Sequence, residues 1–135
     1  MSDKDVIKNF LARLYALPIV ADPKYLAEDI RTLRATYAQS SDFEDALHAV
    51  MREIGHACQN HEHGKALQYS LAGWRRSRFQ LRREPQSPAE LRLIFQEQTK
   101  ELLYVLAFGP RKASDSIYFR ASSRLPETAN ADTPS

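Results

Sequence analysis

The sequence is poor in cysteine and glycine, and it has no long hydrophobic run. A single cysteine, Cys58, allows no disulfide within the chain. The four glycines are scattered singly, which excludes a glycine-rich phosphate loop, and no Ser/His/Asp spacing stands out. The longest apolar run, residues 102–108, is far shorter than the roughly 18 residues of a membrane helix. Because Asp3 and Asp5 also argue against a secretory signal, we expect a cytoplasmic protein with no membrane partner.

Length and composition predict one domain. The chain has 135 residues, 43% of them hydrophobic, which is enough for one packed core. We predict a single domain over residues 1–125, with a helical half over 1–60 and a strand meander over 74–120. Residues 126–135 show no apolar periodicity and are predicted to be a disordered tail.

Positive charge is concentrated in the second half of the chain. Residues 1–64 hold 7 Lys/Arg against 10 Asp/Glu, whereas residues 65–125 hold 12 against 5. Nine of those twelve cations are arginines, whose planar guanidinium groups match phosphate oxygens. This asymmetry favours a nucleic acid or an acidic protein as partner. A solvated charged surface would explain the same numbers, because strands need a polar outer face.

Apolar residues in the first half recur with helical spacing in three segments. The first segment stops at Pro18, which cannot continue a helix. The second begins with Asp22 as N-cap and Pro23 in the first turn. The third begins at Ser41 with Glu44 three residues later, the arrangement of a capping box. We therefore expect three helices before the strands.

The apolar period changes to two after Gly73, as expected of strands. Four stretches fit this description: "WRRSRFQLRR", "LRLIFQ", residues 101–109 and "SIYFR". Together they predict an α+β fold, in which an antiparallel four-stranded sheet is covered on one face by the N-terminal helices. The alternation predicts that six residues face the helices: Phe79, Leu81, Leu91, Leu93, Ile117 and Phe119. Four residues are predicted on the uncovered face: Arg78, Arg82, Arg92 and Tyr118.

A surface of arginines with one tyrosine can carry metal-free RNA cleavage. Guanidinium groups bind the RNA backbone and stabilise the extra negative charge of a pentavalent phosphate. The 2′-hydroxyl of the RNA is the nucleophile, so the protein has to supply only cations and groups that accept and donate a proton. The alternative is that Tyr118 is an ordinary half-exposed strand residue and that the arginines form a solubilising face.

His56, Cys58, His61 and His63 are the only cluster of residue types that ligate metals. Zinc is the metal that such a set would bind. However, structural zinc sites usually consist of two spaced pairs, whereas these four residues crowd one helix end, where histidines also meet the negative pole of the helix. We therefore expect neither a metal nor another cofactor.

An ordered series of short motifs runs from Gly64 to Tyr118. It consists of a Gly-Lys-x-Leu entry, a Leu-x-Gly turn, a basic strand, an arginine-bearing strand ending in an aromatic residue, an apolar strand ending in Gly-x-Arg, and a final tyrosine. This series resembles the RelE/ParE superfamily of toxins from bacterial toxin–antitoxin systems, over less than half of the chain. The resemblance implies a small antiparallel sheet packed on a helical hairpin. For RelE-like members it implies cleavage of messenger RNA, often in the ribosomal A site, and an acidic antitoxin as protein partner.

The resemblance also implies roles for individual residues. Arg92 is similar to the arginine that stabilises the transition-state phosphate, and Arg111 to the one that binds near the scissile phosphate. Tyr118 is similar to the tyrosine that takes part in proton transfer. Three further residues occupy positions expected to bind RNA: Arg78, Arg82 and Lys112.

Two departures from the family pattern leave other functions open. The family usually begins with a short strand, whereas this chain opens with a helix and has one helix more. A missing edge strand would leave the sheet open to strand addition by a partner.

One alternative function is a ParE-type toxin that inhibits DNA gyrase without cleaving RNA, and another is a non-toxic interaction module. The joint presence of Arg92, Arg111 and Tyr118 favours the ribonuclease.

Overall fold

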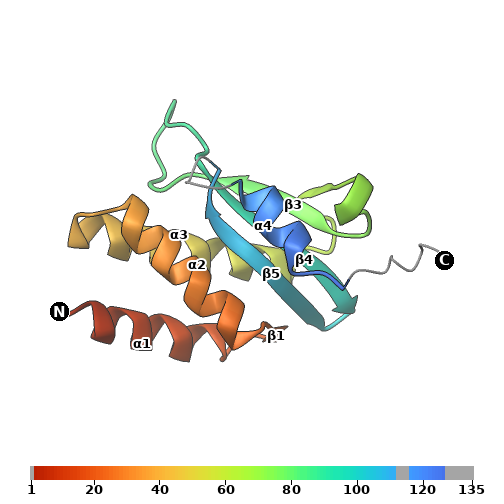
Figure 1. Cartoon of the computed structure of the whole chain (residues 1–135), viewed down its shortest axis with the longest axis horizontal. Helices are drawn as coiled ribbons and strands as arrows, with labels where there is room; N and C mark the ends of the chain where they lie inside the picture. Colours follow the sequence, from red (N-terminus) through yellow and green to blue (C-terminus); the bar gives the residue numbers. More distant parts are fainter. Residues whose placement is uncertain (1, 112–115, 127–135) are drawn as a thin grey trace.

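The computed structural model describes residues 2–111 and 116–126 of the chain (Figure 1). Within these residues the helices are α1 (Asp3–Leu14), α2 (Pro23–Thr36), α3 (Ser40–Gln59), the short 3-10 helix η1 (Tyr69–Leu71) and α4 (Ile117–Ser123). The strands are β1 (Ile19–Val20), β2 (Lys65–Ala66), β3 (Arg75–Phe79), β4 (Leu91–Thr99) and β5 (Leu102–Pro110). No helix in this part of the chain is long and apolar enough to cross a membrane.

The fold is α+β, but its sheet is not the predicted antiparallel sheet of four strands. The structure has a mixed five-stranded sheet in the order β1-β5-β4-β3-β2. Strand β1 runs parallel to β5, with Ile19 opposite Leu103, and the other pairs are antiparallel. Strands β1 and β2 have two residues each, too few for an alternating pattern to be recognised in the sequence.

Helices α1, α2 and α3 enclose the larger core with one face of the sheet. Phe79, Leu91 and Leu93 belong to this core, so the alternation predicted for β3 and the first part of β4 is confirmed. Leu81 packs against the same core and is partly buried. The ring of Phe108 on β5 meets the ring of Phe10 on α1 edge to face, with centroids 5.9 Å apart.

The helix starts were predicted with mixed success. Asp22 caps α2 as expected, because its side chain accepts a hydrogen bond from the backbone N–H of Lys24 at 2.8 Å. The predicted capping box at Ser41 is wrong, because α3 already begins at Ser40 and its N-cap, Gln39, makes no side-chain capping bond.

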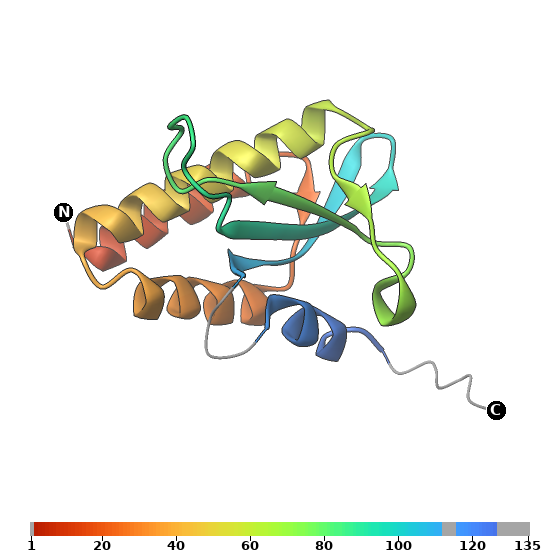
Figure 2. The same cartoon turned by 90° about the horizontal axis from the view of Figure 1, so that it is seen from above.

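The second face of the sheet, which was predicted to be uncovered, is partly covered by α4. Figure 2 shows α4 and α3 on opposite sides of the strands. The stretch "SIYFR" is therefore the start of a helix and not a strand. Ser116 caps it by accepting a hydrogen bond from the N–H of Tyr118 at 3.2 Å. Ile117 and Ala121, one turn apart, face the sheet, whereas the side chain of Phe119 is 71% exposed.

Strand β5 is apolar on both faces because it contributes to both cores, and a β-bulge interrupts its alternation. Ile94 lies opposite Ala107 and Phe95 opposite Val105, so Leu106 is the extra residue on β5. As a result Leu106 and Ala107 both pack with Ile94 under α4, in a second and smaller core.

The outer edge of β5 is closed by side chains. Beyond the two residues paired with β1, the carboxylate of Asp29 on α2 accepts a hydrogen bond from the backbone N–H of Phe108 at 3.0 Å. Arg124, just after α4, donates to the carbonyl oxygen of Leu106 at 2.9 Å, and Arg120 donates to that of Phe108 at 3.3 Å. The open edge inferred for strand addition is therefore occupied along this stretch.

Candidate nucleic-acid interface

Arg92 and Arg111 line the same hollow at one end of the sheet. Arg92 is the second residue of β4 and Arg111 follows β5, and the antiparallel pairing of Arg92 with Gly109 brings these strand ends together. The hollow has a volume of about 310 Å³. We call it the arginine hollow, and it is lined by Thr36, Pro88, Ala89, Glu90, Arg92, Pro110 and Arg111.

The side chain of Arg92 is held in place and is only 6% exposed. Its Nη1 donates to the carbonyl oxygens of Ala89 and Leu91, at 2.5 Å and 3.0 Å. Its Nε is buried and has no hydrogen-bond partner among the described residues. The expectation that Arg92 projects from an open face is therefore wrong, because the segment before β4 covers it. An anion in the hollow would meet a guanidinium whose orientation is already fixed.

Glu90 brings a carboxylate to the arginine hollow, and sequence reasoning did not identify it. Its backbone carbonyl accepts a hydrogen bond from the N–H of Arg111 at 2.9 Å, which continues the pairing past the end of β5. Its side chain accepts a hydrogen bond from the hydroxyl of Tyr37, just after α2. Burial and this bond raise the pKa of Tyr37, so the phenol stays protonated and remains a donor. Glu90 is only two residues before Arg92 in the sequence, but Tyr37, which binds its side chain, is 53 residues away. The sequence around Glu90 therefore does not indicate this contact.

Arg78 extends the positive charge from the arginine hollow along the sheet. It is exposed on β3 and lies directly opposite Arg92 in the register of β3 and β4. Residues opposite each other in an antiparallel pair have side chains on the same face, so Arg78 and Arg92 are neighbours there. This juxtaposition agrees with the face predicted for both residues.

Arg82 is on the other side of the molecule from its predicted position. It donates hydrogen bonds to Asp42 and to Asp45 of α3, the latter at 3.0 Å. The prediction extended the alternation of β3 to Arg82, but β3 ends at Phe79. Lys112, the remaining candidate for RNA binding, lies outside the described residues.

Tyr118 does not reach the arginine hollow in this structure. It lies in the first turn of α4, is half-buried and packs against the smaller core. It is not among the described residues that line the hollow. Its assignment to a strand beside the arginines was wrong, because Ser116 starts a helix there.

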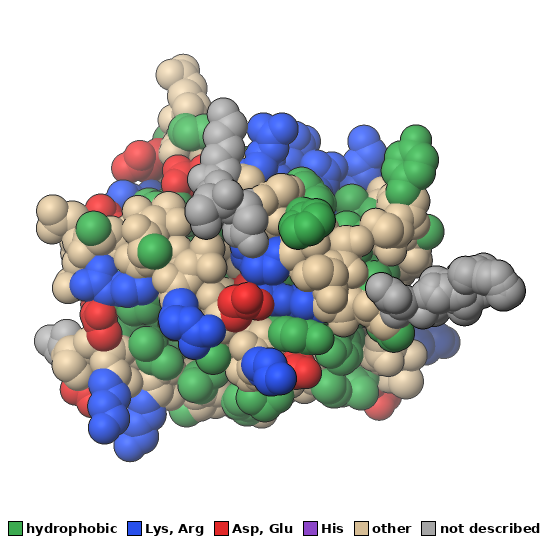
Figure 3. All heavy atoms as spheres, in the orientation of Figure 1, with side chains coloured by type: hydrophobic (Ala, Val, Ile, Leu, Met, Phe, Trp, Pro, Cys, Tyr) green, Lys and Arg blue, Asp and Glu red, His purple; other side chains and the backbone are tan. Residues whose placement is uncertain are grey.

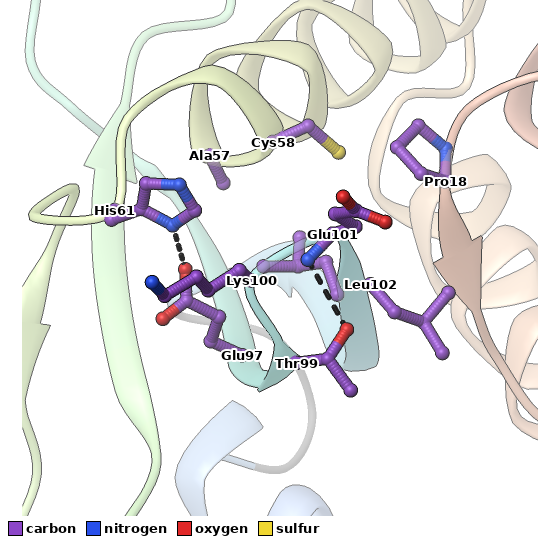
Figure 4. Close-up of a pocket in the computed structure, with 10 residues that line it drawn as sticks. Pro18, Ala57, Cys58, His61, Glu97, Thr99, Lys100, Glu101 and Leu102 are labelled. Carbon is purple, nitrogen blue, oxygen red and sulfur yellow. Dashed lines mark hydrogen bonds and ion pairs between the residues drawn. The ribbon is translucent and has the colours of Figure 1, made fainter.

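The histidines of the predicted cluster face two different carboxylates, Glu53 and Glu97. His63 lies 2.6 Å from a side-chain oxygen of Glu53, whereas His61 contacts Glu97. Figure 4 shows His61 pointing to Glu97, while the thiol of Cys58 points toward Pro18. No group of three His, Cys, Asp or Glu side chains in the described part of the chain is arranged to hold a metal. That the protein is metal-free stays a prediction, which elemental analysis of purified protein would test.

The arrangement suits a ligand that carries a phosphate. It combines a fixed guanidinium, a second arginine at the rim, a third one strand away and a carboxylate held by a protonated tyrosine. Arginine forks favour phosphate oxygens, and a carboxylate beside them can accept a proton. The chain matches no family model, no curated protein and no solved structure.

Proposed function

We propose that this protein is a RelE-like toxin that cleaves messenger RNA at the ribosome without a metal. The observation that carries the proposal is the arginine hollow, in which Arg92, Arg111 and Glu90 meet, with Arg78 opposite Arg92 on the next strand. Two of these four residues, Arg92 and Arg111, are the ones that the motif series assigns to the phosphate.

The order of elements gives the proposal further support. The family pattern begins with a short strand, and β1 supplies such a strand directly before the helices α2 and α3. Helix α1 then precedes the family pattern as an additional element. The hairpin of α2 and α3 and the longer strands β3, β4 and β5 follow in the expected order.

The proposed reaction requires a proton acceptor, and Glu90 is better placed for this role than Tyr118. The 2′-hydroxyl of the RNA gives its proton to the Glu90 carboxylate as its oxygen attacks the neighbouring phosphorus. The bond from phosphorus to the 5′-oxygen breaks, and that oxygen takes a proton from water. The hydroxide so formed takes the proton from Glu90, which restores the carboxylate. Arg92 and Arg111 stabilise the extra charge on the phosphate. The products are a 2′,3′-cyclic phosphate and a 5′-hydroxyl end.

An acidic antitoxin is the proposed protein partner, since Arg78 and Arg111 leave exposed positive charge at this end of the sheet. Such a partner would neutralise the residues that contact RNA. We therefore expect inhibition through occupation of the arginine hollow.

Induced expression in bacteria tests the function. The wild type is compared with Arg92→Ala, Glu90→Gln and Tyr118→Phe, and growth and messenger RNA ends are followed. We expect growth arrest with new cleavage ends in the wild type, and a loss of about 10²-fold or more in cleavage for Arg92→Ala and Glu90→Gln. Arg83→Ala, an exposed arginine that does not line the hollow, is the matched control and should cleave normally. Normal cleavage by Arg92→Ala would disprove the proposed site.

A second candidate function is inhibition of DNA gyrase without RNA cleavage. The observation that favours it is the position of Tyr118, which removes the tyrosine of the ribonuclease pattern from the arginines. Growth arrest with intact messages, together with inhibition of purified gyrase in a supercoiling assay, would establish this function in place of the first.

A further inference from the structure

An apolar groove lies between α1 and α2, away from the arginine hollow. It has a volume of about 540 Å³. Its apolar lining includes Ile7, Leu11, Tyr15, Leu26, Ala27 and Ile30. Figure 3 shows hydrophobic side chains in this region, with Lys and Arg as well as Asp and Glu side chains around them. We call this feature the α1–α2 groove.

The groove exists because α1 has more apolar surface than its packing uses. Val6, Phe10 and Leu14 are buried in the larger core. Ile7 and Leu11 form a neighbouring stripe that stays partly accessible, and Tyr15, which continues it, is 50% exposed. A helix needed only as a cover for the core would carry polar residues along this stripe.

The rim of the groove is positively charged. Lys4 and Lys8 are spaced one turn from Ile7 and Leu11 along α1. Lys24 and Arg31 are exposed on α2, and none of these four cations forms an ion pair with another described residue.

Two carboxylates of α1 and α2 pair with cations that do not line the groove. Asp3 pairs with Arg34 at 2.6 Å, and Glu28 pairs with Arg124 at 2.6 Å. Asp22 caps α2. Asp5 and Asp22 pair with no cation among the described residues, so four unpaired cations stand against two unpaired carboxylates and the net charge is positive.

We propose that the α1–α2 groove binds an acidic amphipathic helix of another protein. The apolar lining offers few hydrogen-bonding groups, so the occupant has to satisfy its own backbone, which a helix does and an extended strand does not. The lysines and Arg31 at the rim select acidic residues beside the apolar stripe of that helix. A second copy of this chain is disfavoured, because the same groove would bring lysines against lysines.

This inference does not depend on the proposed ribonuclease. The α1–α2 groove shares no lining residue with the arginine hollow. A partner helix could occupy the groove of an active enzyme, of a gyrase inhibitor or of an interaction module alike. RNA cleavage and helix binding can therefore be measured, and can fail, separately.

The experiment uses the full chain and two synthetic helical peptides of about 18 residues, roughly 27 Å long as helices. Both carry leucines at the same i, i+3, i+4 and i+7 positions, and the remaining positions are mainly glutamate in one peptide and lysine in the other. Fluorescence anisotropy measures binding. We expect the glutamate peptide to bind at least about tenfold more tightly, a difference of about 1.4 kcal/mol, and to weaken as salt is raised.

Two substitutions on α2 make the test specific for the groove. Ala27→Glu places a negative charge in the lining and should weaken binding of the glutamate peptide by at least about tenfold. Ala35→Glu changes another exposed alanine of the same helix that is not in the lining, and it should bind like the wild type. Circular dichroism verifies that both variants are folded.

Three results would overturn the proposal. They are equal binding of the two peptides, no binding of the glutamate peptide, and equal loss in the two variants. Sedimentation of the chain alone tests whether a second copy of the chain occupies the groove. A concentration-dependent dimer that Ala27→Glu abolishes would assign the groove to that second copy.

Discussion

Arg124, the C-cap of α4, donates hydrogen bonds to both carboxylate oxygens of Asp29 on α2, at 2.7 Å and 2.9 Å, across 95 residues of sequence. Arg120 adds a bond to the same carboxylate at 3.0 Å. Asp29 is only 1% exposed, and its burial raises its pKa while the bonds from Arg124 oppose that rise. This single carboxylate connects two helices and the edge of β5.

Asp29→Ala should therefore be among the most destabilising substitutions in the chain. It removes from two buried guanidinium groups the carboxylate that they share, and we expect a loss of about 3–5 kcal/mol in the free energy of unfolding. Glu28→Ala is the control, because Glu28 also pairs with Arg124 but is half-exposed, and it should cost under about 1 kcal/mol. Urea unfolding measures both. Similar losses in the two variants would contradict the importance assigned to burial.

Arg92→Ala should cost stability as well as activity. The substitution removes two hydrogen bonds to backbone carbonyls near a buried strand end, so we expect a loss of about 1–3 kcal/mol. Arg78→Ala, opposite it on β3, removes an exposed side chain and should change stability by less than about 0.5 kcal/mol. The melting temperatures of the two variants, measured by thermal unfolding, test this difference in stability. An unchanged melting temperature for Arg92→Ala would mean that its observed contacts contribute little.

Two glycine substitutions should have opposite signs. Gly109 has a φ of +152°, and an added Cβ would lie 3.1 Å from Nη2 of Arg120, so Gly109→Ala should lose at least about 1 kcal/mol. Gly55 is inside α3 with nothing within 4 Å of an added Cβ, so Gly55→Ala should gain about 0.5–1 kcal/mol. Chemical denaturation of both variants checks the signs, and a stabilised Gly109→Ala would refute the backbone argument.

Cys58 should react slowly with alkylating reagents. Burial raises the pKa of its thiol, and only the thiolate attacks. Because a raised pKa means less thiolate at any pH below it, the rate of modification by iodoacetamide should be lower than that of free cysteine at neutral pH. The rate should also rise at a higher pH than that of free cysteine. Mass spectrometry measures the rates, and the urea-unfolded protein, which should react like free cysteine, is the control.

Local patterns in the sequence predicted part of the fold and of the site. The cap at Asp22 and the inward faces of Phe79 and Leu93 depend on neighbours a few residues away, and both predictions are confirmed. The stretch after Ser116 was misassigned because Ile-Tyr-Phe-Arg alternates over four residues. The spacing typical of a helix was also present in this stretch, since Arg120 and Arg124 are four residues, or one helical turn, apart.

Tertiary contacts decided what local patterns could not. The hydroxyl of Tyr37 holds the side chain of Glu90 in the site, and no residue near Glu90 in the sequence predicts this contact. Arg82 left the predicted face because Asp42 and Asp45 hold it on α3. Tyr118 was assigned by position in a motif series, which carries no information on the element that bears it.

The residues that close the edge of β5 are among the last to be synthesised. Asp29 and Phe108 leave the ribosome before Arg120 and Arg124, whose side chains complete the network around them. Until those last cations emerge, the nascent chain has a carboxylate without its counterions and a strand edge without its cover. We therefore expect a chain that ends before Arg120 to leave this edge of β5 uncovered and more prone to pair with other strands.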